Sequence, residues 1–197
     1  MLAVLRPRNA DQARHQLQLL QQAGLCHVEL AVSLDPDWPR WVRVLVHDFP
    51  ALSLGAASVR CSAGLDAAIA AGLGYAVSPI LERSLLQRAA AAAIPLVPGV
   101  FSPSEIAAAV AWGAPAVKLY PAASLGPHYW RLLAGPLQPL PFCIAAGGLA
   151  VADVEPWLEA GVNAVALGSS LFRRGDQGLM LEPGLPSLLQ RLHRDEP

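Results

Sequence analysis

One lysine lies in a stretch of the chain that is otherwise apolar. Lys118 is the only lysine of the 197 residues, and it stands between Val117 and Leu119 in the strand-like run AVKLYP. Because side chains alternate along a strand, Lys118 points away from the face that its two neighbours occupy. A buried ammonium group is costly unless its pKa falls or a carboxylate lies near it. A lysine with a lowered pKa can form Schiff bases with ketones, whereas a surface lysine or a structural ion pair would have no such chemistry.

A carboxylate occupies a similar position earlier in the chain. Glu29 alternates with Val28 and Leu30 in the run HVELAV. If both strands belong to one sheet, Glu29 can pair with Lys118 and carry protons during iminium chemistry. The alternative is a buried salt-bridge partner without a chemical role.

Eight strand-like runs must position these two side chains. They begin at residues 2, 27, 52, 75, 95, 116, 142 and 164, and helical segments rich in alanine or leucine lie between most of them. Alternating strands and helices of this length indicate parallel strands with right-handed crossovers. We therefore predict a compact (β/α)8 barrel of the TIM type, as a single domain over residues 1–197. We expect no helix before the first run to close the barrel floor, and we expect the last helix over 182–194.

Capping residues mark several helix starts within this pattern. Ser102 and Glu105 form a predicted capping box around Pro103. Asn9 is expected to cap the first helix, and Asp153 the helix that contains Trp157.

The candidate site residues fall at the carboxyl ends of the strands, where barrels of this kind carry their chemistry. Glycines end the last two strands, and loops of this type can hold a phosphate with backbone N–H groups. Ser169 and Ser170 would add hydroxyl donors, although glycines can also merely make tight turns. The residues read from these ends are Arg6, Glu29, Ser58, Ser78-Pro79, Gly99, Lys118, Gly147-Gly148 and Gly168-Ser169.

Composition excludes several other functions. Only 15% of the residues are charged and the formal net charge is −1, so we expect no nucleic-acid partner. The longest uncharged stretch, residues 132–152, is interrupted by proline and glycine, so we expect no membrane span. Three cysteines without metal or redox spacing favour a reduced, cytoplasmic location. No histidine–carboxylate pair has metal spacing, and we expect neither a metal nor a cofactor.

Taken together, the motifs resemble those of the class I aldolases that cleave 2-keto-3-deoxy-6-phosphogluconate or 2-keto-3-deoxy-6-phosphogalactonate. The resemblance covers nearly the whole chain. It rests on VEL at 28–30, GAASV at 55–59, AVSP at 76–79, VPGVFSPSE at 97–105, KLYPA at 118–122 and the GG and GSS loops.

The resemblance implies a reaction and roles for individual residues. Lys118 would form the Schiff base, Glu29 would transfer protons, and Arg6 would lie near the pyruvyl carboxylate. The products would be pyruvate and glyceraldehyde 3-phosphate, and the family implies a homotrimer. The other substrate-binding positions that it implies are Ser58, Pro79, Tyr120, Gly147, Gly148, Gly168 and Ser169.

Several positions depart from the usual pattern. Ala57-Ser58 replaces a usual Gly-Thr, and Ile80 stands where glycine or asparagine is common. Ala145 and Ala146 replace the proline and threonine of the phosphogluconate type, so the chain looks more like the phosphogalactonate type. Three alternatives therefore stay open: a 4-hydroxy-2-oxoglutarate aldolase, a phosphosugar isomerase without a covalent adduct, and a barrel that only binds.

Overall fold

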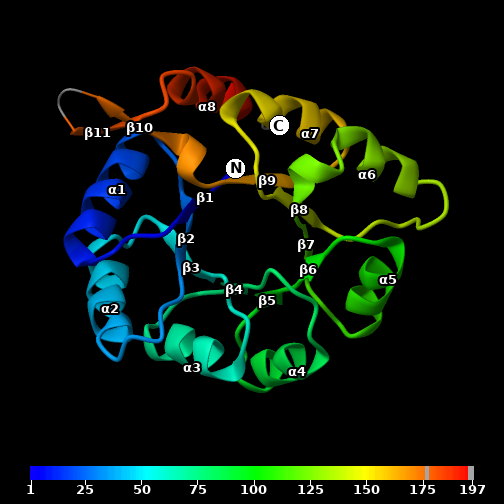
Figure 1. Cartoon of the computed structure of the whole chain (residues 1–197), viewed down its shortest axis with the longest axis horizontal. Coiled ribbons are helices and arrows are strands. Elements are labelled where there is room, and N and C mark those ends of the chain that lie inside the picture. Colours follow the sequence, from blue (N-terminus) through cyan, green and yellow to red (C-terminus); the bar gives the residue numbers. More distant parts are fainter. Residues whose placement is uncertain (176–177, 195–197) are drawn as a thin grey trace.

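The structure, a computed structural model, describes residues 1–175 and 178–194. A ring of parallel strands occupies the centre of the molecule and helices surround it (Figure 1). The order within the sheet is β5-β4-β3-β2-β1-β9-β8-β7-β6. The strands are β1 (Leu2–Leu5), β2 (His27–Ala31), β3 (Ser53–Ala57), β4 (Ala76–Val77), β5 (Leu96–Val97), β6 (Gly99–Val100), β7 (Val117–Leu119), β8 (Cys143–Ala146) and β9 (Ala164–Leu167).

The ring closes through Pro98. Strand β5 pairs with β4, and β6 pairs with β7, so the two are halves of one run. Pro98 separates them because it has no N–H to donate to the sheet. Its carbonyl oxygen still accepts a hydrogen bond from the Lys118 backbone N–H at 2.8 Å. The nine strands therefore correspond to the eight predicted runs, and the predicted α/β barrel is confirmed.

Helices follow the strands around the outside of the barrel. The predicted caps at Asn9 and Ser102 are confirmed, the latter as a complete capping box with Glu105. The α-helices are α1 (Ala10–Gln22), α2 (Trp38–Asp48), α3 (Ser62–Ala70), α4 (Arg83–Ala91), α5 (Pro103–Ala111), α6 (Pro127–Leu133), α7 (Val154–Glu159) and α8 (Leu185–Arg194). Short 3-10 turns are η1 (Ala122–Ser124), η2 (Val151–Asp153) and η3 (Ser169–Leu171).

Two details of the helices differ from prediction. The Asp153 carboxylate accepts a hydrogen bond from the Ala150 backbone N–H at 2.7 Å, so it closes the turn before α7 and does not cap α7 itself. The last helix begins at Leu185, because the Glu182 carboxylate binds the Gly184 N–H in a turn that precedes it.

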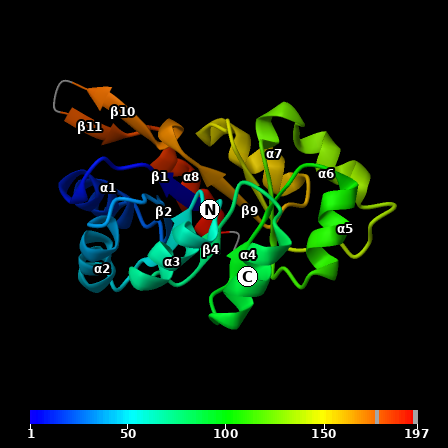
Figure 2. The ribbon, with the colours of Figure 1, turned by 60° about the horizontal axis from the view of Figure 1, so that its bottom comes forward.

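An antiparallel hairpin, not predicted from the sequence, lies before that turn. Strand β10 (Phe172–Gly175) pairs with β11 (Gly178–Leu181). Figure 2 shows it extending from the edge of the barrel beside α1. Arg173 of β10 forms an ion pair with Glu182 at 2.9 Å, which ties the hairpin to the start of the last helix.

Two apolar layers hold the barrel together. The outer layer packs strand side chains such as Leu5 and Leu30 against helix side chains such as Leu17 and Trp157. The inner layer fills the barrel with Leu2, Val77, Val97, Ala116, Ile144, Ala146, Ala164 and Ala166. Within the described ranges, no helix has the length and apolar character needed to cross a membrane.

Candidate active site

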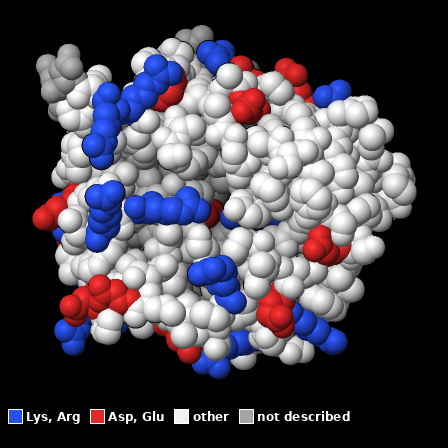
Figure 3. Space-filling model, in the orientation of Figure 1, with Lys and Arg blue, Asp and Glu red and all other residues white. Residues whose placement is uncertain are grey.

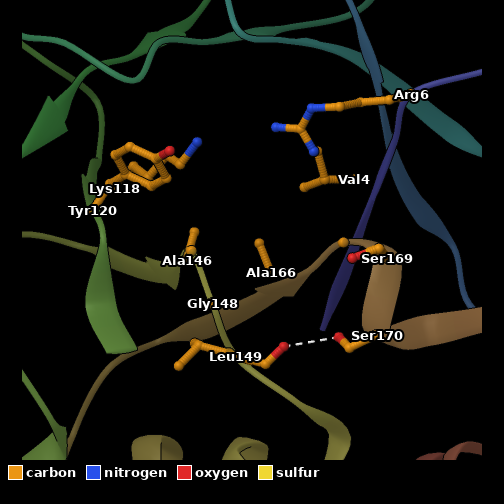
Figure 4. A pocket seen from close by; sticks show the side chains of 12 residues that line it. Val4, Arg6, Lys118, Tyr120, Ala146, Gly148, Leu149, Ala166, Ser169 and Ser170 are labelled. Carbon is orange, nitrogen blue, oxygen red and sulfur yellow. Dashed lines mark hydrogen bonds between the residues drawn. The ribbon is translucent and has the colours of Figure 1, made fainter. Parts of the chain in front are cut away.

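A cavity of about 300 Å³ lies at the carboxyl ends of the strands (Figure 4). Its lining consists of Val4, Arg6, Lys118, Tyr120, Ala146, Gly147, Gly148, Leu149, Ala166, Gly168, Ser169 and Ser170. A second cavity of about 280 Å³ adjoins it, lined by Arg6, Val32, Ser58, Arg60, Pro79, Lys118 and Tyr120. Because Arg6, Lys118 and Tyr120 belong to both, the two cavities form one continuous site.

Lys118 is held in the barrel wall with its side chain inward. It pairs with Gly99 of β6 and Ile144 of β8, and its neighbours Val117 and Leu119 are fully buried in the outer layer. Lys118 is only 6% exposed, and its Nζ atom lies 4.7 Å from the centre of the Tyr120 ring. Burial lowers the pKa of the Lys118 amine; Glu29 opposes this effect and Arg6 adds to it. The amine therefore reaches its neutral, nucleophilic form more easily than an exposed lysine.

Glu29 lies deeper inside the barrel. It pairs with Val4 of β1 and Gly55 of β3, and it is 1% exposed. Burial raises the pKa of Glu29 to about 7, although Lys118 and Arg6 both act to lower it. Neither carboxylate oxygen has a hydrogen-bond partner among the described residues. A carboxyl group that changes protonation near neutral pH is suited to general acid/base catalysis.

Arg6 lies on the wall opposite Lys118. Figure 4 shows the two cationic side chains reaching into the cavity from opposite sides. In Figure 3, lysine and arginine side chains flank the central hollow of the face shown. The local charge therefore favours an anionic ligand although the whole chain has a net charge of −1.

The loops after β8 and β9 form the floor of the larger cavity in Figure 4. A Cβ atom on Gly147, whose φ is +96°, would lie 2.8 Å from the Tyr120 ring, so only glycine fits there. The Ser170 hydroxyl donates a hydrogen bond to the Leu149 carbonyl oxygen at 2.8 Å and so joins the two loops. Both serines expected as ligand donors line the cavity, but the Ser170 hydroxyl donates its proton to the Leu149 carbonyl oxygen within the protein.

The structure brings the residues predicted for the site into one region. Ser58, with φ at +62°, and Pro79 line the second cavity, and Arg6, Lys118, Tyr120 and the predicted glycines and serine of the last two loops line the first. Ser78 and Gly99 line neither cavity: the Ser78 hydroxyl accepts a hydrogen bond from the Ile80 N–H, and Gly99 pairs with Lys118. Sequence reasoning missed Arg60 in the second cavity and Tyr75, whose side chain packs against the inner layer. Two-residue alternation could have found Tyr75, which precedes Val77 at that spacing. It could not have found Arg60, because β3 ends at Ala57 and Ser58 has a positive φ.

A metal cluster is absent from the part of the chain that the structure describes. No group of three or more histidine, cysteine, aspartate or glutamate side chains there could hold a metal ion.

Comparison with known proteins places this arrangement in a family. The family model for KDPG and KHG aldolase matches residues 1–178. The 2-dehydro-3-deoxy-6-phosphogalactonate aldolase of Escherichia coli K12 is 28% identical over 89% of this chain and 85% of its own length. A probable enzyme of the same name from Rhizobium meliloti is 31% identical over 89% of this chain and 82% of its own.

The solved structures show the same likeness. One described as native KDPGal superposes with a TM-score of 0.83 at 25% identity, over 98% of this chain and 94% of its own. The family match, the aldolase relatives and the barrel agree: the chain belongs to the KDPG and KHG aldolase family of carbon–carbon lyases.

Proposed function

We propose that this protein is a class I aldolase that cleaves a 2-keto-3-deoxy-6-phospho sugar acid through a Schiff base on Lys118. The observation that carries the proposal is a lysine of lowered pKa, buried at the carboxyl end of a barrel strand and lining a cavity together with Arg6. Desolvation of a lysine is one of the ways in which proteins activate its amine as a nucleophile.

The reaction follows from the two buried groups. The neutral Lys118 amine attacks the C2 ketone, and loss of water leaves a protonated imine. As the C4 hydroxyl gives its proton to the Glu29 carboxylate, the C3–C4 bond breaks and its electron pair moves into the imine. Glyceraldehyde 3-phosphate leaves, and the remaining enamine takes a proton at C3 from Glu29. Water then hydrolyses the imine, which releases pyruvate and restores Lys118.

The cavity offers separate places for the two anionic ends of such a substrate. Arg6 is suited to the carboxylate next to the imine, because a guanidinium binds carboxylates in a bidentate manner. Gly148, Gly168 and Ser169 line the part formed by the β8 and β9 loops and would hold the phosphate. Ser58, Pro79 and Tyr120 would contact the sugar acid between these ends.

The galacto configuration at C4 is the one that we propose for the substrate. It is supported by the alanines before Gly147 and by the phosphogalactonate aldolases among the relatives. The family also contains KHG aldolases, and an Escherichia coli K12 relative named KHG/KDPG aldolase is 30% identical over 78% of this chain and 70% of its own. Cleavage of 4-hydroxy-2-oxoglutarate, which has no phosphate, is therefore the second candidate.

We further propose that residues 1–197 act as one barrel domain, within a cytoplasmic homotrimer. Three free cysteines are consistent with a reducing compartment. A designed cage made by fusing symmetric oligomeric domains contains a barrel similar to this one, with a TM-score of 0.79 at 26% identity over 96% of this chain and 68% of that chain.

A pyruvate-release assay with three substrates tests the proposal. The phosphogalactonate, phosphogluconate and unphosphorylated hydroxy-oxoglutarate acids are supplied at equal concentration. We expect the phosphogalactonate acid to give the highest kcat/KM. Equal cleavage of the unphosphorylated acid would contradict the role of the β8 and β9 loops, and absence of pyruvate from all three would overturn the proposed function.

A further inference from the structure

Two polar groups inside the barrel have no hydrogen-bond partner within residues 1–175 and 178–194. One is the Glu29 carboxylate and the other is the hydroxyl of Tyr75, the residue just before β4. Such groups are rare in folded proteins, because an unsatisfied buried donor or acceptor costs about 1–3 kcal/mol. Tyr75 packs against the apolar inner layer of the barrel, and Glu29 is 1% exposed in the neighbouring strand β2. We therefore asked whether they act on each other.

Gly55 lies between the two residues in the sheet. It pairs with Glu29 on one side, and the next residue, Ala56, donates its backbone N–H to the Tyr75 carbonyl oxygen at 2.8 Å on the other. A Cβ atom on Gly55 would lie 2.3 Å from Tyr75 Cζ, the ring carbon that carries the hydroxyl. The Tyr75 ring thus lies over Gly55, the residue that pairs with Glu29, and its hydroxyl-bearing carbon is the ring atom closest to that position.

The other charged groups that act on Glu29 come from the substrate side. Lys118 projects from β7, and Arg6 follows β1 at the cavity. Tyr75 enters from the amino-terminal side of the barrel, since it precedes β4 whereas Pro79, at the far end of that strand, lines the cavity. Burial and the nearby Glu29 both raise the pKa of Tyr75, so its hydroxyl keeps its proton and can donate it in a hydrogen bond.

We propose that Tyr75 is a positioning residue that holds Glu29 from the side of the barrel opposite the substrate. When Glu29 ionises, the Tyr75 hydroxyl donates a hydrogen bond to its carboxylate, directly or across one water molecule. One oxygen is then fixed, and the other faces Lys118 and the substrate. The catalytic consequence rests on the proposed function, but the coupling between the two side chains does not.

Removal of the hydroxyl should therefore change the protonation of Glu29. A hydrogen bond to the charged form lowers the pKa of a carboxyl group. Tyr75→Phe keeps the ring over Gly55 and deletes only the donor, so the pKa of Glu29 should rise by about one unit. Tyr129→Phe is the matched control, because the Tyr129 hydroxyl lies on α6 outside the barrel and donates to the Phe101 carbonyl oxygen at 2.9 Å.

The test is a carbon-13 NMR titration of the glutamate carboxyl carbons. Glu29→Gln assigns the Glu29 signal, and the titration needs neither substrate nor turnover. We expect its midpoint to move upward by about one pH unit in Tyr75→Phe and to stay within a few tenths of a unit in Tyr129→Phe. An unchanged midpoint in a folded Tyr75→Phe protein, or an equal shift in both variants, would overturn the proposal.

Activity separates this proposal from the proposed function. If the wild type cleaves its substrate, the acidic limb of kcat/KM should follow the NMR midpoint in Tyr75→Phe, with little change in KM. A shifted midpoint in a protein that cleaves nothing would overturn the aldolase assignment and support the coupling. Normal turnover with an unmoved midpoint and limb would support the aldolase and overturn the role of Tyr75.

Discussion

At the scale of single residues, the pKa values of Lys118 and Glu29 are shifted from their ordinary values in opposite directions. Burial lowers the pKa of the amine and raises that of the carboxyl group. The mutual attraction of the two charges opposes both shifts, and in each case burial is the larger effect. The barrel interior therefore favours the neutral forms, which a carbonyl attack by lysine and a proton donation by glutamic acid require.

The buried carboxyl group predicts a pH-dependent cost in stability. The pKa of Glu29 is about 7 in the folded protein, against an ordinary value of 4.5, so Glu29 favours folding below its unfolded pKa and loses that contribution as the pH rises through about 7. Between about pH 5 and pH 8, the free energy of unfolding of Glu29→Gln should therefore gain about 2 to 3 kcal/mol relative to the wild type.

Urea unfolding of both proteins at the two pH values measures this gain. Glu159→Gln, on the exposed end of α7, controls for the substitution itself. A constant difference between Glu29→Gln and the wild type at both pH values would show that Glu29 is not held at a raised pKa. Turnover by Glu29→Gln should be slow, since a carboxamide cannot accept the C4 proton.

The inward-facing charges could be predicted from the sequence, but their partners could not. Alternation alone identified Lys118 and Glu29 as out of place in apolar strands. The Ser170 hydroxyl donates a hydrogen bond to the Leu149 carbonyl oxygen, and the Tyr75 ring lies over Gly55. Both contacts join separate strands or loops. Such contacts are set by the register of the closed barrel, which one sequence does not reveal.

At the scale of elements, the strand runs and two helix caps could be predicted because their signals are local. The division of one strand into β5 and β6 at Pro98 could not be predicted, because it depends on which neighbouring strand each half pairs with. The hairpin of β10 and β11 could not be predicted either, because its strands are partly exposed and lack a regular apolar alternation. Asp153 does not cap α7 as predicted, because a short 3-10 turn precedes this helix and the Asp153 carboxylate accepts a hydrogen bond from the Ala150 N–H at the start of that turn.

The loop after β8 predicts a site-specific effect of one methyl group. In Gly147→Ala, the new Cβ atom meets the Tyr120 ring, which lies beside the Lys118 amine. Gly161→Ala is the matched control, since its φ is +93° and nothing lies within 4 Å of the added atom. Both variants should lose about 1 kcal/mol of stability from the positive φ, but only Gly147→Ala should lose kcat/KM, by about tenfold or more. Equal activity of the two variants would contradict the placement of Tyr120.

The turn after α4 predicts a gain in stability. Ala93 has a φ of +53°, a conformation that costs a residue with a Cβ atom about 1 kcal/mol. Ala93→Gly should therefore raise the free energy of unfolding by roughly that amount, whereas Ala90→Gly, at an exposed position inside α4, should lower it by about 1 kcal/mol. Denaturant unfolding of the two variants gives both values. A loss of stability in Ala93→Gly would show that Ala93 does not adopt this conformation in solution.

At the scale of the whole molecule, charge is unevenly distributed. On the face shown in Figure 3, the surface around α6 has few charged side chains, and Arg131 is the exposed charged residue of α6 itself. Leu132 of α6 is 61% exposed, Phe101 before α5 is 43% exposed, and Val110 in α5 is 51% exposed. A surface with few charges and with exposed apolar side chains is typical of a contact between subunits.

The proposed trimer can be disrupted on that surface. Light scattering of the wild type should give a mass of three chains, and Leu132→Asp should reduce it. Val44→Asp, on α2 at 51% exposure, places the same charge on another part of the barrel and should leave the trimer intact. A monomeric wild type, or equal dissociation by both variants, would contradict the proposed interface.

The central claim is the covalent bond between Lys118 and a keto acid, and borohydride reduction in the presence of pyruvate tests it most directly. The chain suits this experiment because its only other primary amine is the amino terminus. We predict one reduced pyruvyl group per chain, located by peptide mapping on the fragment that contains Lys118, and none in Lys118→Arg. A folded wild-type protein without the adduct, or with the adduct only at the amino terminus, would contradict the account.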